Sequence, residues 1–221
     1  MAQHKSDIEV GYDRVAEDYA SDYFEELKRK PFDRDLLDGF ARSVKAMGQG
    51  EVLEIGCGPG QVARYLKDRG INIRGLDLSS EMVGIARRLN PDIRFEQGDM
   101  LALRLPDESF TGVVLFYSII HIKREEVTRA LQEINRVLKR GGRMFISFHA
   151  GEGELHRDEW YGQPVSIDFR LFDKREMARY VDAAGFDDVS VMERPPYDFE
   201  YPTKRVYIFA RAIKKTLKEP E

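Results

Sequence analysis

Apolar positions recur along this chain at two spacings, and the change from one spacing to the other marks its organisation. Residues 7–28 and 31–47 carry apolar and aromatic side chains at steps of three and four, which predicts N-terminal helices. Further on, short apolar runs alternate with segments of helical spacing. The runs predict strands over residues 51–55, 71–76, 93–96, 113–117 and 143–148. Strands and helices that alternate in this way are typical of a parallel sheet covered on both faces.

The pattern changes after the fifth predicted strand. Residues 149–168 show no clear period and are expected to be irregular. Asp173 and Glu176 form a capping pattern, which predicts a helix through Ala184. Two strand-like runs follow, at 188–193 and 205–210. The loop between them is short for a parallel crossover, which needs about a dozen residues, so it predicts an antiparallel pair.

Three glycines, Gly56, Gly58 and Gly60, follow the first predicted strand at two-residue spacing. Helical spacing begins directly after them, so they predict a tight turn that leads into a helix N-terminus. Such turns bind nucleotides in many folds. The dinucleotide fingerprint, however, has the spacing G-x-G-x-x-G, which this turn lacks. Glu54 would also oppose a pyrophosphate and favour an ammonium group, so a dehydrogenase is disfavoured.

Acidic residues stand at the ends of the first three predicted strands, at Glu54, Asp77 and Asp99. Ligands of open α/β sheets bind beyond the carboxyl ends of the strands. We expect Asp77 to accept hydrogen bonds from both hydroxyls of a ribose, because the two oxygens of one carboxylate can each accept one. The alternative is a carboxylate that caps a helix or a turn.

Composition narrows the class of protein. The 221 residues are 42% hydrophobic and 33% charged, which fits a single domain, 1–221, with a real core. Its expected parts are N-terminal helices over the site (1–48), a cofactor-binding core (49–150) and a substrate-loop region with the closing strands (151–221). A net charge of −4 gives no reason to expect nucleic acid. No apolar run is long enough to span a membrane, no signal peptide is evident, and one cysteine suits a cytoplasmic protein.

The ordered motifs resemble those of class I S-adenosylmethionine-dependent methyltransferases. They are Glu54-Ile55-Gly56-Cys57-Gly58-Pro59-Gly60, Leu76-Asp77-Leu78-Ser79, Gln97-Gly98-Asp99 and Leu138-Lys139-Arg140-Gly141-Gly142. Together they cover about residues 50–150. An early stretch, Tyr12-Asp13-Arg14-Val15-Ala16-Glu17-Asp18-Tyr19, is similar to one in small-molecule members. The resemblance implies a three-layer α/β sandwich whose seven-stranded, mostly parallel sheet has the order 3-2-1-4-5-7-6 and an antiparallel last strand, with the N-terminal helices as an addition.

The resemblance also implies that the cofactor is S-adenosylmethionine, with S-adenosylhomocysteine as product. Glu54 and the backbone of Gly56, Cys57, Gly58 and Gly60 would hold its methionine end. Asp77 would bind the ribose. The remaining contacts would come from Leu78 and Met82 on the adenine, Asp99 on its amino group, Met100 beside it, Phe116 near the methionine moiety and Tyr19 over the cofactor. One departure is Thr111, which follows Phe110 where the family often has an acid.

A general base is needed only if the acceptor must lose a proton, and histidine suits that task. His121 and His149 follow the fourth and fifth predicted strands and are the candidates. Each can equally be a structural histidine that bonds to the backbone. The histidines form no compact metal motif, so we expect no metal. Cys57 can be read as a nucleophile, but a small residue that suits the turn explains it better.

These observations favour a methyltransferase (EC 2.1.1.-) that moves a methyl group to an O, N or C atom of a small molecule. The alternatives are a methyltransferase of RNA, DNA or protein, and a silent cofactor-binding protein. No basic excess or extra module supports base methylation. Neither the acceptor nor the choice between a monomer and a homodimer can be read from the motifs. We expect acceptor specificity to lie in the N-terminal helices and in residues 149–170 and 194–203.

Overall fold

Seven strands form one sheet in the computed structural model, which describes residues 6–214. They are β1 (Glu51–Ile55), β2 (Asn72–Asp77), β3 (Arg94–Gln97), β4 (Phe110–Phe116), β5 (Leu138–His149), β8 (Phe186–Arg194) and β9 (Arg205–Ala212). Their order is β3-β2-β1-β4-β5-β9-β8. The first five are parallel, and β9 runs antiparallel to both of its neighbours. The predicted fold class and sheet order are therefore confirmed.

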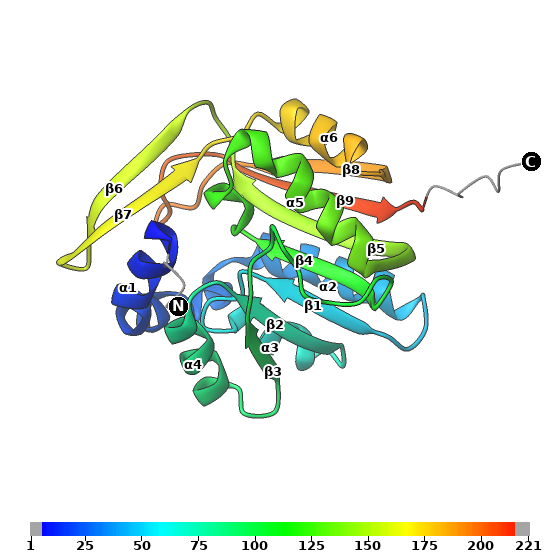
Figure 1. The fold of residues 1–221 in the computed structure, drawn as a ribbon, viewed down its shortest axis with the longest axis horizontal. Coiled ribbons are helices and arrows are strands. Elements are labelled where there is room, and N and C mark those ends of the chain that lie inside the picture. The colour runs from blue at the N-terminus through cyan, green and yellow to red at the C-terminus, as the bar shows by residue number, and fades with distance from the viewer. Residues whose placement is uncertain (1–5, 215–221) are drawn as a thin grey trace, which may run out of the picture.

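Helices cover both faces of this sheet (Figure 1). They are α1 (Asp7–Tyr23), α2 (Pro31–Lys45), α3 (Gln61–Lys67), α4 (Ser80–Leu89), α5 (Arg124–Val137) and α6 (Lys174–Ala183), with short 3-10 turns η1 (Glu26–Arg29) and η2 (Ile119–His121). Sequence signals locate several of their ends. Ser79 caps α4 by accepting from the Met82 backbone N–H, and Asp173 caps α6 in the same way. The helix predicted from Asp173 is thus confirmed.

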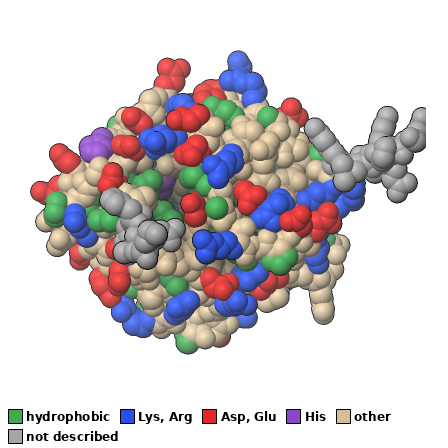
Figure 2. Space-filling view, in the orientation of Figure 1, with side chains coloured by type: hydrophobic (Ala, Val, Ile, Leu, Met, Phe, Trp, Pro, Cys, Tyr) green, Lys and Arg blue, Asp and Glu red, His purple; other side chains and the backbone are tan. Residues whose placement is uncertain are grey.

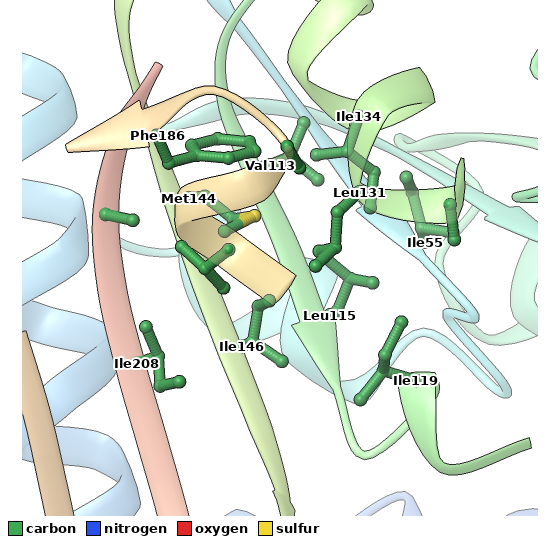
Figure 3. Close-up of a cluster of buried hydrophobic side chains, with 14 of the residues drawn as sticks. Ile55, Val113, Leu115, Ile119, Leu131, Ile134, Met144, Ile146, Phe186 and Ile208 are labelled. Carbon is green, nitrogen blue, oxygen red and sulfur yellow. The ribbon is translucent and has the colours of Figure 1, made fainter. Parts of the chain in front are cut away.

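The core has two halves because successive side chains of a strand point to opposite faces. Val113 and Leu115 of β4 pack with α5 and α6, whereas Val114 packs with α2 and α3 on the other face. Figure 3 shows the first half, where Leu131 and Ile134 of α5 lie among apolar side chains of the sheet. A strand that is buried on both faces reads as a continuous apolar run, which is why β4 was visible in the sequence.

Residues 149–168, expected to be irregular, are mostly a hairpin of β6 (Glu154–Trp160) and β7 (Gln163–Arg170). It stands apart from the main sheet and lies beside α1 in Figure 1. Strand β6 is exposed along nearly its whole length, so it carries no apolar alternation to reveal it. The usable signal is Tyr161-Gly162. Both residues have positive φ angles (54° and 70°), as a two-residue type I′ hairpin turn requires.

Strand β5 also differs from its predicted limits. It begins at Leu138 instead of residue 143, because Leu138 pairs with Phe110 before the register shifts. Gly141 lies within the strand at a φ of 77°. The change lengthens the strand but leaves its carboxyl end, which faces the site, next to that of β4.

Helix α1 lies between the hairpin and α4. Its Val15 packs on Val165 and Ile167 of β7, and its Ala16 and Ala20 pack on α4. Gly11 permits the close approach, since a Cβ there would lie 2.7 Å from Cδ1 of Ile167. The predicted N-terminal addition therefore packs on the hairpin through one face of α1 and on α4 through another.

Candidate active site

Two adjoining cavities lie at the carboxyl ends of the parallel strands. The first, the narrow pocket, is about 110 Å³ and lies between the ends of β1, β2 and β4 and helix α1. The second, the wide cavity, is about 710 Å³ and extends to the hairpin and to the β8–β9 loop. Four aromatic side chains line both, so the cavities meet there: Tyr12, Tyr19, Phe116 and Tyr117.

The glycine turn has the backbone that its sequence predicted, with φ angles of 70° at Gly56, 51° at Gly58 and 86° at Gly60. Gly56 is needed for packing, because a Cβ there would lie 2.3 Å from Cβ of Ser118. Gly58 differs. A Cβ there would come no closer than 3.7 Å to Tyr19, and the residue lines the narrow pocket. Bare backbone thus faces the pocket at Gly58.

Asp77 lines the narrow pocket at the end of β2. Its Oδ2 accepts from the Gly58 backbone N–H at 2.7 Å, and its Oδ1 accepts from the Ser79 N–H at 2.9 Å. Burial raises the pKa of Asp77 to about 6, although these two N–H groups oppose the shift. The turn-capping role and the ligand role left open by the sequence are therefore compatible, because each oxygen keeps a further lone pair.

Glu54 lies beneath the turn, 1% exposed, and its Oε2 has no hydrogen-bond partner among the described residues. Burial raises the pKa of Glu54 well above its usual range, against the backbone N–H of Ala63. A buried carboxyl in this state gains most from a nearby cation. The orphaned oxygen is therefore an unused acceptor near the turn that an ammonium group would satisfy, although Glu54 does not line the narrow pocket.

The other expected cofactor residues fall into two groups. Gly56, Leu78, Met82, Asp99, Met100, Phe116 and Tyr19 line the narrow pocket. Glu54, Cys57 and Gly60 do not, because they are buried. Asp99 is exposed and accepts from the Leu101 backbone N–H at 2.8 Å. Burial raises the pKa of the Cys57 thiol, which opposes a role as a nucleophile.

His121 lines the narrow pocket and contacts the helix opposite. Its Nδ1 lies 3.0 Å from the backbone oxygen of Asp168, and its Nε2 lies 2.9 Å from the Tyr12 hydroxyl. A carbonyl can only accept, so Nδ1 carries the proton and Nε2 accepts from Tyr12. Burial lowers the pKa of His121 to about 4, which keeps the ring neutral. The Tyr12 contact joins residues 109 positions apart, and the sequence held no signal for it.

His149 lines the wide cavity instead. Its Nδ1 lies 2.8 Å from the Thr203 hydroxyl. Burial, with the charges of Arg205 and Lys30, lowers the pKa of His149 to about 3. The two candidate histidines thus occupy different cavities, and neither is poised to take a proton near neutral pH.

A buried ionic network behind the wide cavity was not foreseen. Asp33 of α2, fully buried, accepts from Arg194 at 2.8 Å and from the Tyr207 hydroxyl at 2.8 Å. Arg194 also pairs with Glu200 at 2.6 Å, and Glu200 pairs with Lys30 at 3.3 Å. The network ties the β8–β9 loop to α2 and η1. It thereby shapes the wall of the wide cavity.

Within residues 6–214 no three His, Cys, Asp or Glu side chains gather as metal ligands. Over the same residues, every helix is too short or too polar to cross a bilayer. Acidic and basic side chains are interspersed on the face drawn in Figure 2.

The sheet order, the glycine turn and the strand-end acids are those of the class I S-adenosylmethionine-dependent methyltransferase fold. The model of a family described as "Methyltransferase domain" matches residues 52–142. The predicted resemblance to this class is confirmed, and S-adenosylmethionine is the cofactor of the class.

Individual relatives agree on the class and differ in what their names say they act on. A demethylmenaquinone methyltransferase of Chlorobaculum parvum is 30% identical over 66% of this chain and 61% of its own length. A malonyl-[acyl-carrier protein] O-methyltransferase of Pectobacterium atrosepticum is 34% identical over 63% and 51%. The chain spans about half the length of the curated relatives it matches. A putative methyltransferase of Haloferax volcanii, solved with the Trm112 methyltransferase activator, has a TM-score of 0.69 at 23% identity over 95% and 99%.

Proposed function

We propose that this protein transfers a methyl group from S-adenosylmethionine to a small-molecule acceptor. The observation that carries the proposal is Asp77, whose carboxylate lines the narrow pocket and holds the N–H of Gly58 beside it. A carboxylate beside exposed backbone suits the two hydroxyls of a ribose, which would donate hydrogen bonds to it. The orphaned Glu54 oxygen beneath the turn supports a cationic methionine end on the same side.

In this proposal the remaining residues bind the cofactor mainly through packing contacts. Leu78, Met82 and Met100 offer an apolar slot for the adenine, with Asp99 at its exposed rim. When bound, S-adenosylmethionine supplies an activated methyl group for an in-line displacement. The protein then contributes mainly alignment and exclusion of water.

Helix α1 forms one wall of the narrow pocket through Ile8, Glu9, Tyr12 and Tyr19. The pocket of about 110 Å³ is smaller than the roughly 300–1,000 Å³ of ordinary ligand sites. We infer that α1 shifts outward when the cofactor enters. The packing of Gly11 against Ile167 sets how readily it does so.

We assign the wide cavity to the acceptor, because it adjoins the narrow pocket at Phe116 and Tyr117. Its volume suits a small molecule. His121 serves here as a positioning residue, since its Nε2 is occupied by the Tyr12 hydroxyl that stands at the junction. His149 presents a neutral ring to the acceptor side.

Calorimetric titration with S-adenosylhomocysteine tests the cofactor assignment. We expect the wild type to bind, and Asp77→Asn to bind at least about tenfold more weakly, the size of one lost charge-assisted hydrogen bond. Because the pKa of Asp77 is about 6, wild-type affinity should also fall as the pH drops from 7 to 5. Asp182→Asn, an exposed change on α6, is the matched control. Failure of the wild type to bind would show the assignment to be wrong.

The class of acceptor needs a separate measurement. Formation of S-adenosylhomocysteine is assayed with fractionated metabolites and, in parallel, with RNA. We expect turnover with the metabolite fractions. Turnover with RNA alone would overturn the small-molecule proposal.

A further inference from the structure

Charged side chains surround the wide cavity, and most of them already have partners. Among the cations, Lys30 pairs with Glu26 at 2.5 Å and with Glu200 at 3.3 Å. Arg170 pairs with Asp168 at 3.1 Å and with Glu154 at 3.2 Å, and Arg205 approaches Glu200. These cations are neutralised within the protein. They offer little to a ligand.

The acids of the cavity are engaged as well. Glu26 also accepts from the Gln61 side chain at 3.1 Å, besides its pairing with Lys30. Glu25 pairs with Lys28 at 2.7 Å, and Asp22 accepts from the Tyr161 hydroxyl at 2.6 Å. A cationic ligand would therefore have to compete with existing partners for nearly every carboxylate.

Two guanidinium groups that line the wide cavity differ from these cations in how they are held. Arg157 of β6 lies over the rings of Trp160 and Phe169, 4.9 and 6.0 Å from their centroids. Arg29 of η1 lies 3.8 Å from the centroid of Phe199. Neither has a carboxylate or hydrogen-bond partner anywhere in residues 6–214. Stacking on a ring holds a guanidinium in place and leaves its in-plane N–H donors free.

Arg157 is connected to the junction of the two cavities. Trp160, under its guanidinium, contacts Tyr12 at a centroid distance of 5.8 Å. The charge of Arg157 also acts on Tyr12, where it opposes the rise in the pKa of that phenol. Arg157 therefore projects its field toward the place where acceptor and cofactor would meet.

We propose that the methyl acceptor is an anion with a flat, apolar body, whose carboxylate or phosphate group binds the free guanidinium of Arg157. The planar fork of donors fits either oxyanion in a bidentate way. The aromatic side chains that line the junction, above all Phe116 and Tyr117, receive the apolar body. Arg29, on the same cavity, adds to the positive field. This inference rests on the proposed function, in which the wide cavity holds the acceptor.

Three probes with one body test the charge preference: 2-naphthoate, 2-naphthamide and 2-naphthylmethylammonium. Each is titrated into the full chain by calorimetry, with and without S-adenosylhomocysteine. We expect 2-naphthoate to bind at least tenfold tighter than the other two, and this advantage to shrink as salt is added. Equal affinities, a preference for the ammonium probe, or no binding of 2-naphthoate would overturn the proposal.

Variants locate the anion site. Arg157→Gln should weaken 2-naphthoate binding at least tenfold, about 1.4 kcal/mol. Arg157→Lys keeps the charge but loses the fork, so it should bind with intermediate affinity. Arg129→Gln, which removes an exposed arginine of α5 that has no partner within residues 6–214, is the matched control and should bind like the wild type. If Arg157→Gln loses no more than this control, Arg157 is not the anion site.

The two proposals fail separately. If S-adenosylhomocysteine binds but no anion preference appears, only the acceptor class is wrong. If S-adenosylhomocysteine does not bind but the anion preference and the Arg157→Gln loss are present, the anion site stands and the cofactor assignment fails.

Discussion

Replacing Gly56 with alanine should destabilise the protein through one identifiable clash. The added Cβ would lie 2.3 Å from Cβ of Ser118 and 3.0 Å from its Oγ. Ser118 cannot simply turn away, because it is buried and its Oγ donates to the Ile55 carbonyl at 2.6 Å. The φ of 70° at Gly56 adds strain for any residue with a Cβ.

The magnitude follows from two contributions. A left-handed φ costs about 1–2 kcal/mol for a residue other than glycine. Overpacking of a tight interior costs about 1–3 kcal/mol. Gly56→Ala should therefore lower the free energy of unfolding by about 2–5 kcal/mol. Gly58→Ala is the matched control, because its φ is 51° and its Cβ would meet nothing closer than 3.7 Å. It should lose only the backbone contribution, about 1–2 kcal/mol.

Urea denaturation of a double-mutant cycle isolates the clash. Ser118→Gly removes the opposing Cβ, and alone it should cost about 1–2 kcal/mol through a lost hydrogen bond and added backbone freedom. In Gly56→Ala/Ser118→Gly the steric contribution disappears, so the loss should fall short of the sum by about 1–3 kcal/mol. Additivity within about 0.5 kcal/mol would refute the steric explanation.

Three further outcomes follow from the buried groups and from α1. The pKa of His121 is lowered from 6.5 to about 4, so the free energy of unfolding should fall by about 3 kcal/mol as the pH drops from 6.5 to 4, where the unfolded chain binds this proton and the folded one does not. His121→Gln should flatten this acid limb of the stability curve, and an unchanged limb would contradict the assignment. Asp33→Ala should cost roughly 3–5 kcal/mol in urea, because it leaves Arg194 buried without its carboxylate; a loss under 1 kcal/mol would mean that water reaches the pair. Gly11→Ala should speed hydrogen exchange across α1, because its Cβ would press on Ile167 at 2.7 Å; unchanged exchange would show that the contact relaxes.

The cofactor side of the site could be predicted largely from local sequence. Gly56 to Gly60 lie in the positive-φ turn that their spacing indicated, and Asp77 lines the pocket beside them. Parallel strands bring their carboxyl ends to one edge, so residues at those ends meet whatever the details of packing. The same rule could not tell which residues face the pocket. Glu54 of β1 does not line the pocket, because successive side chains of a strand point to opposite faces.

The acceptor side was not predictable in the same way. The β6–β7 hairpin has one solvated strand, and the contacts of Tyr12 with His121 and of Asp33 with Arg194 join residues more than 100 positions apart. No spacing rule covers such pairs, since they depend on how separate elements dock.

The sequence by itself determined the sheet, the turn and the carboxylates at the strand ends, because period and glycine spacing act within a few residues. Only the tertiary structure decided what surrounds the acceptor: which histidine meets which cavity, which cations are neutralised, and that Arg157 keeps its donors free. Charge pairing is a property of distances between elements. It emerges only when those elements are packed together.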